Sequence, residues 1–285
     1  MSAKRAAAAC AVCAALGWAV APPAERWAEP EPVPAGSPAA PQAVGSPAAR
    51  VPARVPFGVG ERLTYQVKFG VVRVGAAELR VVGIDTVGGS PAYRIRHTVQ
   101  GRLPFYRVDD EQESWLDVFG LFSRKFRQNL REGDYRRDRE YVFDIERRVW
   151  IRDDGETDTL PTAEPLDDIA FLYFARMLPL EVGRRYEFHR YFREERNPVV
   201  LEVLRRDTVL VPAGRFPVLV VRPIIKAGGV YGEGGESEVY LSDDERRIIV
   251  QTRAKAKVGA LHLSLTEMRP GVPIGELPGF RSSGP

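Results

Sequence analysis

The stretch RLTYQVKF at residues 62–69 decides the fold class. Its apolar side chains, Leu63, Tyr65, Val67 and Phe69, alternate with polar or charged ones. Successive side chains of a β-strand point to opposite faces of the sheet, so this period of two places the apolar set on one face. The stretch therefore predicts a strand that is buried on one side.

Similar alternation recurs at 93–99, 140–145 and 261–266, and turn-forming residues separate such runs. The turn segments are VGGSP (87–91), REGD (131–134), RDDGE (152–156), VPAG (211–214) and LSDDE (241–245). Glycine, proline and aspartate favour turns because they provide or tolerate the backbone angles that turns need. Strands at short spacing, with little helix between them, predict a mainly antiparallel sheet.

One segment has helical rather than strand periodicity. Apolar residues recur at helical spacing over 168–178, Asp167 or Asp168 is a suitable N-cap, and Pro179 ends the run. The apolar residues cover too wide an arc for a helix lying on open solvent. We therefore expect this helix to pack on the concave side of a curved sheet, as the lid or floor of any site there.

Two parts of the chain carry matching residues in the same order. VGERLTY at 59–65 resembles VGRRYEF at 182–188. Further matches follow at offsets of 123 to 125 residues: Gly89 with Gly214, Glu113 with Glu238, Trp115 with Tyr240, Leu116 with Leu241, Arg124 with Arg247 and Gln128 with Gln251. Their order predicts an internal duplication, with halves near 57–152 and 180–270 joined by the helix at 168–178.

The predicted fold is thus mainly β. Residues 57–270 should form a curved antiparallel sheet, a half-barrel or open barrel built from two duplicated halves, with one short helix on its concave side. Ten of the 23 prolines lie from Pro22 to Pro56, and apolar residues are not regularly spaced there. We expect a disordered Pro/Ala-rich linker at 25–56 and a disordered tail at 271–285.

The N-terminus predicts export. Lys4 and Arg5 precede an apolar run at 6–21, which is shorter than the ~20 apolar residues of a membrane span. Residues 1–24 are therefore expected to be a signal peptide or an N-terminal anchor. The protein should be periplasmic or otherwise exported, with membrane association only through an uncleaved N-terminus.

Composition argues against a nucleic-acid partner. The formal net charge of +3 is small beside 41 basic and 38 acidic residues, and acidic residues interrupt the arginines, as in REGDYRRDRE at 131–140. Nucleic-acid-binding proteins instead concentrate basic charge on one face. The hydrophobic content of 44% is also too high for a wholly disordered chain.

The domain resembles a known bacterial family over residues 57–270. The resemblance rests on GERLTYQVKFGVVRVGAAEL (60–79), DDIAFLYFARMLPL (167–180) and VPAGRFPVLVVRP (211–223), and the family is domain of unknown function 3108. It implies an exported protein of no assigned activity. By analogy alone, such sheets are similar to the half-barrel carriers of lipoproteins and lipids in the cell envelope, and no single residue can be transferred from them.

No enzyme signature is present. His97, His189 and His262 are isolated in sequence, and both cysteines, Cys10 and Cys13, lie in the N-terminal apolar run. The acidic pairs lie in turns, and no Gly-x-Ser-x-Gly motif occurs. We expect no catalytic residue, no metal and no cofactor.

An apolar ligand needs only aliphatic and aromatic side chains inside a curved sheet. The candidate lining residues are Tyr65, Phe69, Trp115, Tyr141, Phe143, Phe171, Phe174 and Tyr240; alternatively, they form an ordinary core. The leading hypothesis is an exported binding protein for a lipid or a lipoprotein acyl chain. The alternatives are an assembly module that binds another envelope protein through a sheet edge, and a hydrolase with a non-local site.

Overall fold

The computed structural model describes residues 55–103, 106–225, 237–255, 260–278 and 280. The predicted signal segment and all but the last two residues of the predicted linker lie outside these ranges. The strands are β1 (Arg62–Phe69), β2 (Val72–Val87), β3 (Ser90–Leu103), β4 (Tyr106–Asp117), β5 (Ser123–Glu132), β6 (Tyr135–Asp144), β7 (Val149–Arg152), β8 (Thr157–Thr159), β9 (Arg185–Phe188), β10 (Val199–Val211), β11 (Gly214–Ile225), β12 (Ser237–Ser242), β13 (Ile249–Lys255) and β14 (Ala260–Arg269). The helices are α2 (Asp168–Arg176) and the 3-10 helices η1 (Glu194–Arg196) and η2 (Ile274–Glu276).

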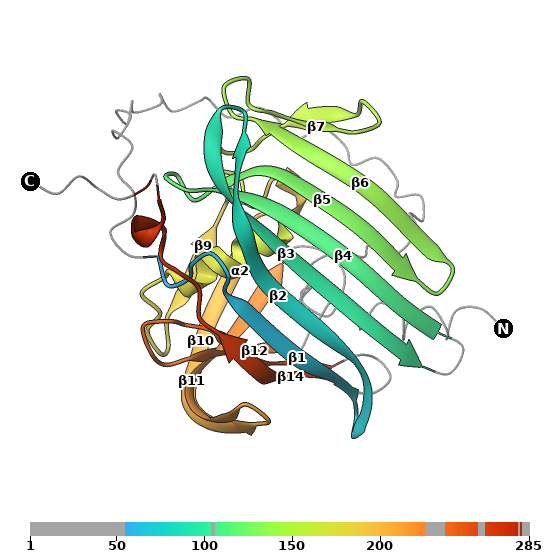
Figure 1. Cartoon of the computed structure of the whole chain (residues 1–285), viewed down its shortest axis with the longest axis vertical. Helices are drawn as coiled ribbons and strands as arrows, with labels where there is room; N and C mark the ends of the chain where they lie inside the picture. Colours follow the sequence, from blue (N-terminus) through green and yellow to red (C-terminus); the bar gives the residue numbers. More distant parts are fainter. Residues whose placement is uncertain (1–54, 104–105, 226–236, 256–259, 279, 281–285) are drawn as a thin grey trace, which may run out of the picture.

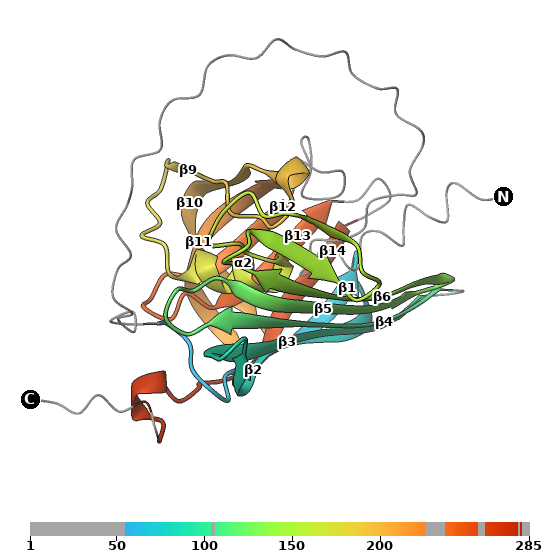
Figure 2. The ribbon, with the colours of Figure 1, turned by 90° about the horizontal axis from the view of Figure 1, so that it is seen from above.

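The fourteen strands form one antiparallel sheet in the order β8-β7-β6-β5-β4-β3-β2-β1-β14-β13-β12-β11-β10-β9. Every neighbour in this order is also a neighbour in sequence, except that β1 pairs with β14. The sheet curves around α2 without closing, so β8 and β9 form its edges within the described residues (Figures 1 and 2). The predicted mainly β fold, an open barrel with one short helix on its concave side, is confirmed.

Strand β1 shows how the sequence period produces this arrangement. Leu63, Tyr65 and Val67 are buried at no more than 1% exposure, whereas the residues between them are partly exposed. The apolar face of the strand is the concave face of the sheet, and it packs around α2. Burial of that face supplies the main driving force for folding, about 25 cal/mol for each Å² of apolar surface removed from water.

The helix begins where the sequence predicts and ends slightly earlier. The side chain of Asp167 is the N-cap and accepts hydrogen bonds from the backbone N–H groups of Ile169 and Ala170. Met177 is the C-cap, so α2 stops at Arg176 rather than at residue 178.

Strands β1–β8 and β9–β14 form two consecutive meanders, and one irregularity of strand pairing recurs in both. The β4–β5 register shifts between Trp115 and Leu116, and the β12–β13 register shifts between Tyr240 and Leu241, 125 residues later. These details support the predicted duplication. It stays a prediction, which superposition of the two meanders would test.

The described residues continue past residue 270, into the segment for which the sequence predicted a disordered tail. Val59 and Val272 exchange two backbone hydrogen bonds of 2.9 and 2.8 Å. A Cβ added at Gly271 would lie 2.1 Å from the carbonyl oxygen of Gly58, so this crossing requires a residue without a side chain. Ile274 of η2 is buried at 5% exposure, which fixes the segment against the domain.

Candidate functional site

A groove of about 440 Å³ lies at the C-terminal end of α2. Three segments far apart in sequence meet there: the chain entering β1, the turn between β12 and β13, and the chain leaving β14. The lining is mainly apolar, with charged side chains among it: Val55, Pro56, Phe57, Gly58, Glu61, Arg176, Met177, Leu178, Glu245, Arg246, Arg247, Ile248, Met268, Pro270, Gly271 and Pro273. This volume is within the range of small-molecule sites, about 300–1,000 Å³.

An ion pair between Arg176 and Glu61 lies at the base of the groove. The Nη1 and Nη2 atoms of Arg176 lie 2.6 and 2.9 Å from the two carboxylate oxygens of Glu61. The side chain of Arg176 is fully buried and that of Glu61 is 6% exposed. A bidentate pair of this kind is strong but depends on both partners, because either charge alone would be buried without compensation.

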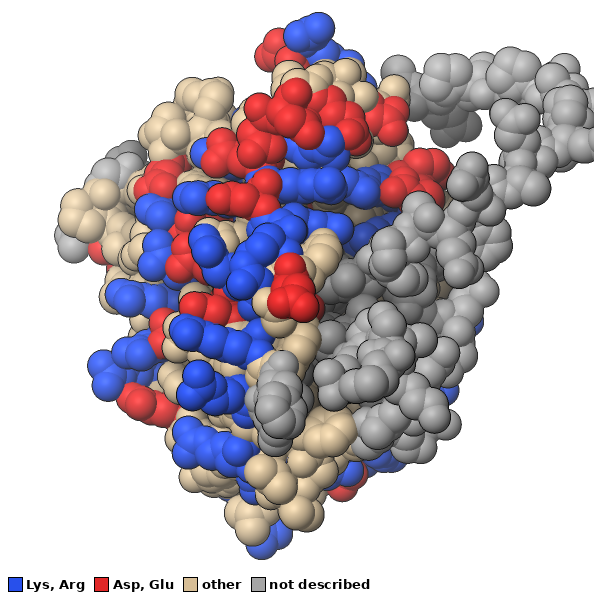
Figure 3. Space-filling view, turned by 90° about the vertical axis from the view of Figure 1, so that its right-hand side faces the viewer, with Lys and Arg blue, Asp and Glu red and all other residues tan. Residues whose placement is uncertain are grey.

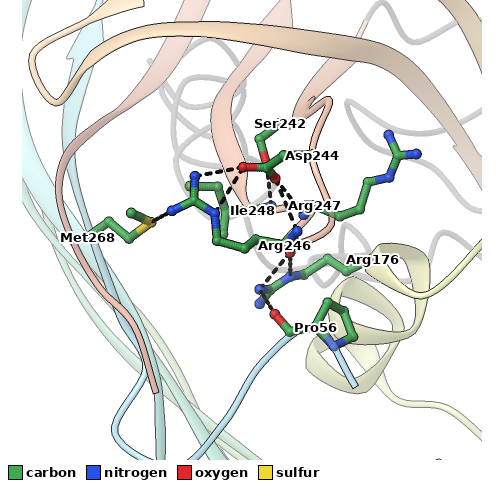
Figure 4. A network of polar contacts seen from close by, with 8 residues as sticks. All are labelled: Pro56, Arg176, Ser242, Asp244, Arg246, Arg247, Ile248 and Met268. Atoms are coloured by element: carbon green, nitrogen blue, oxygen red, sulfur yellow. Dashed lines mark hydrogen bonds and ion pairs between the residues drawn. The ribbon is translucent and has the colours of Figure 1, made fainter. Parts of the chain in front are cut away.

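Backbone carbonyls, which Figure 4 shows, and aromatic rings complete the surroundings of Arg176. Its Nη2 atom donates to the carbonyl oxygens of Pro56, at 3.0 Å, and Arg246, at 3.1 Å. Its guanidinium lies over the rings of Phe57 and Tyr173, at 5.6 and 5.1 Å from their centroids. Arg176 thus joins the entering chain, the helix end and the β12–β13 turn.

The β12–β13 turn forms the charged side of the groove. Asp244 accepts hydrogen bonds from the hydroxyl of Ser242 at 2.6 Å and from the Nη2 atom of Arg246 at 2.6 Å (Figure 4). The Nη1 atom of Arg246 lies 3.6 Å from the sulfur of Met268. The turn therefore places the ion pair of Arg246 and Asp244 beside an apolar wall, a combination that suits an amphiphile better than a purely apolar molecule.

Two buried carboxylates lie at the opposite end of α2. Asp167 accepts a hydrogen bond of 2.7 Å from Ser114, and Asp168 accepts one of 2.6 Å from the hydroxyl of Tyr191. Burial raises the pKa of Asp167 to about 7, although the hydrogen bonds from Ala170 and Ser114 oppose the rise. Burial also raises the pKa of Asp168.

Asp167 should make stability depend on pH. The pKa of Asp167 in the folded protein lies above the ordinary value of 3.8. The stability that the protonated carboxyl contributes is therefore fully present below pH 3.8 and is lost as pH rises through about 7. Asp167→Asn keeps an N-cap acceptor but cannot titrate. We expect the free energy of unfolding of the original protein to fall relative to this variant between pH 4 and 7.5, by roughly 1.4 kcal/mol for each unit of pKa shift. Urea unfolding of both proteins across this window measures the difference, and a constant difference would contradict the prediction.

The described residues contain no group of three His, Cys, Asp or Glu side chains that could hold a metal ion. His97 lies on the concave face, with its Nδ1 atom 3.4 Å from the side-chain oxygen of Gln112. Burial lowers the pKa of His97 to about 4, so its ring is neutral near pH 7. None of the described helices is long and apolar enough to cross a membrane.

Six of the eight predicted lining residues lie on the concave side, and none of the eight lines the groove. The six are Tyr65, Phe69, Tyr141, Phe143, Phe171 and Phe174. Most are packed among other aromatic rings: Phe171 lies 5.8 Å from Phe174, and Tyr141 lies 5.3 Å from Phe192, between ring centroids. The hydroxyl of Tyr65 donates to the carbonyl of Ile249.

Trp115 and Tyr240 lie on the convex face instead. The indole N–H of Trp115 donates to Asp85 at 2.9 Å, and the ammonium of Lys125 lies 4.9 Å from the ring centroid. Tyr240 has a similar position, because the guanidinium of Arg253 lies 5.2 Å from its ring centroid. The two aromatic residues therefore both lie on the convex face, and neither faces the concavity.

The ion pair at the base of the groove is the feature that sequence reasoning missed. Arg176 lies in the last turn of α2, where its positive charge also complements the helix dipole. Its spacing from Ile169, Leu172 and Tyr173 places it on the apolar helical face, and that signal could have indicated burial. Its partner Glu61 is 115 residues away in the chain, and no local pattern links the two.

Comparisons with known proteins give a family and a set of similar folds. No curated protein matches the chain. A β-barrel-like protein of domain of unknown function DUF1849 from Brucella abortus is similar at 8% identity and a TM-score of 0.49, covering 76% of this chain and 99% of that one. A candidate lipoprotein from Parabacteroides distasonis has 10% identity and a TM-score of 0.33, covering 75% and 98%.

A candidate exported protein with a YmcC-like fold from Bacteroides fragilis has 13% identity and a TM-score of 0.27, covering 75% of this chain and 97% of that one. The model of a family described as protein of unknown function (DUF3108) matches residues 64–266. That match spans more than half of the sequence and confirms the expected resemblance. The chain therefore belongs to the DUF3108 family.

Proposed function

We propose that this protein is a non-catalytic binding protein of the cell envelope and that its ligand is apolar or amphiphilic, a lipid or the acyl chain of a lipoprotein. The basic and apolar N-terminal sequence supports export. The observation that carries the binding proposal is the groove at the C-terminal end of α2, with its mainly apolar wall and charged side.

The chemistry of the lining suits a flexible chain. Met177 and Met268 contribute two unbranched thioether side chains, which adapt to ligands of different shape. Arg246 and Arg247, which pair with Asp244 and Asp243, stand at the charged side, where a polar head group would lie near them. Arg176 already has its full set of partners, so it holds the base of the groove rather than reaching for the ligand.

Binding can be measured with N-phenylnaphthylamine, whose fluorescence rises in an apolar site. Leu178 lines the groove and is partly buried, and Leu178→Asp places a charge in its apolar wall. We expect the dissociation constant of the probe to increase roughly tenfold, since burying a leucine side chain is worth about 1.5–3 kcal/mol. Mass spectrometry under native conditions, on protein purified from its own cell envelope, should show a bound lipid.

Leu210→Asp is the control, because Leu210 is 76% exposed on β10 and lies outside the groove. It should leave probe binding unchanged. Equal binding by the Leu178→Asp variant, together with the absence of any co-purified lipid, would rule out the proposal.

The free edges of the sheet favour a second function, binding another envelope protein through added strand pairing. Strand β8 is exposed at all three of its residues and lies at one edge of the described sheet. A photo-crosslinker placed at Asp158, the middle residue of this strand, should then capture one defined envelope protein. Capture from Asp158, with no lipid in the groove, would favour this assembly role over ligand binding.

A further inference from the structure

The hairpin between β1 and β2 ends in two exposed apolar side chains. Val71 is 92% exposed and Val72 is 61% exposed. The hairpin extends to the lower right of Figure 1, away from α2. These two valines contribute little to the stability of the fold, because neither is buried against the rest of the domain.

Four basic side chains lie in a row across the strands next to this end. The strand register places Arg73 opposite Lys68, Lys68 opposite His262, and His262 opposite Arg253. Residues directly opposite each other share one face, which here is the convex face, because Val67, Leu261 and Leu263 beside them point inward and are buried. Like charges placed opposite each other destabilise a sheet.

This row lacks the direct carboxylate partners that accompany arginines elsewhere on the convex face. Arg205, for example, pairs with Glu238 at 2.9 Å. Glu238 also lies opposite Arg253 in the strand register, but both of its carboxylate oxygens accept hydrogen bonds from Arg205. In the described part of the chain, Lys68, Arg73 and Arg253 have no carboxylate within ion-pair distance. Figure 3 shows the more usual pattern, with Asp and Glu between many of the rows of Lys and Arg on the face at the right of Figure 1.

The surroundings of His262 indicate the resulting local charge. Burial lowers the pKa of this histidine, and the positive charges of Arg253 and Lys68 lower it further. Among the described residues, the row therefore presents positive charge without a carboxylate in direct contact, beside an apolar hairpin end.

We propose that the end of the β1–β2 hairpin and the adjacent basic row form a surface that docks on an anionic lipid bilayer. Val71 and Val72 would enter the interfacial region, while Lys68, Arg73 and Arg253 contact the head groups. Apolar side chains flanked by Lys and Arg are what such a surface requires, since the two contributions add. A soluble polyanion would use the cations alone and leave the two valines in water.

This surface belongs to the β domain, whereas the sequence suggested membrane contact only through the N-terminus. It also does not depend on the proposed groove, because none of its residues lines that groove. Loss of docking and loss of probe binding can therefore be observed separately.

Sedimentation of the full chain with vesicles tests the proposal. Phosphatidylcholine vesicles are compared with vesicles that also contain phosphatidylglycerol. Lys68→Gln with Arg73→Gln should lower partitioning to the anionic vesicles roughly 25-fold, about fivefold for each of the two cations removed. Val71→Ser with Val72→Ser should lower it roughly tenfold. All variants retain the same N-terminal sequence, so any contribution from residues 6–21 is constant.

The β10–β11 hairpin provides a matched control, because its exposed Leu210 lies directly opposite Arg215. Leu210→Ser with Arg215→Gln should leave partitioning unchanged. Thermal unfolding of each variant checks that the fold is intact. Equal partitioning of the Lys68/Arg73 variant and the original protein would overturn the proposal, as would equal losses in the control. Dependence on the cations but not on the valines would indicate a soluble polyanion instead of a bilayer and would also overturn it.

Discussion

Glu61→Ala should lower the free energy of unfolding by about 3–5 kcal/mol, because it leaves the guanidinium of Arg176 buried without a countercharge. Small domains have total stabilities of about 5–15 kcal/mol, so this single change removes a large share of the margin. Urea unfolding followed by tryptophan fluorescence measures the loss. A loss under about 1 kcal/mol would mean that water reaches Arg176 and that the base of the groove is not sealed.

Two further variants separate the buried pair from a general effect of losing charge. Glu267→Ala breaks an exposed ion pair, in which the side chain of Arg269 is 64% exposed and that of Glu267 is 53% exposed. This variant should change the free energy of unfolding by less than about 1 kcal/mol. Glu61→Leu combined with Arg176→Met removes both buried charges together and should recover much of the stability. Failure of the double variant to recover would assign the loss to the carbonyl contacts of Arg176 instead.

Phe171→Ala should lower the free energy of unfolding by about 3–5 kcal/mol, the usual cost of truncating a buried phenylalanine. Phe171 is 1% exposed, and its ring centroid lies 5.8 Å from that of Phe174 and 5.9 Å from that of Phe188. Since Phe171 does not line the groove, N-phenylnaphthylamine should bind the folded variant as it binds the original protein.

Phe174→Ala is the matched control on the same helix. Phe174 is only partly buried and its outer side is covered by Arg190, whose guanidinium lies 4.7 Å from the ring centroid. Phe174→Ala should therefore lower the free energy of unfolding by less than Phe171→Ala does. Loss of probe binding in Phe171→Ala at nearly unchanged stability would instead make Phe171 a lining residue of a second apolar site, as the sequence suggested.

The architecture was predictable because local patterns encode it. The alternation around Tyr65 and the apolar arc around Phe171 each identify an element and the face that it buries. Antiparallel pairing then follows from the short turns between strands. These signals depend on residues only a few positions apart in the chain, so they can be read directly from the sequence.

The site was not predictable to the same degree, because it is built from contacts between distant segments. Glu61 and Arg176 meet only after β1 and the helix are both in place. Trp115 shows a second reason: its aromatic ring suggested an inward position, whereas Glu113 two residues earlier shares its face and binds Arg94 there. A large aromatic side chain can be covered by cations on the convex face, as Trp115 is, or by apolar side chains on the concave face. The residue type alone therefore does not tell which face it occupies.

The order of strands has a consequence for how the chain reaches its fold. Every pairing except that of β1 with β14 joins strands adjacent in sequence, so each meander can assemble from contacts that close short loops. The β1–β14 pairing instead brings Thr64 opposite Glu267 across almost the whole domain, and its closure carries the largest loss of chain entropy. Until that seam forms, β1 and β14 each have an unpaired edge, and the β14 of one molecule can meet the β1 of another. An exchanged dimer joined through this seam is the misassembly that the topology favours during refolding at high protein concentration.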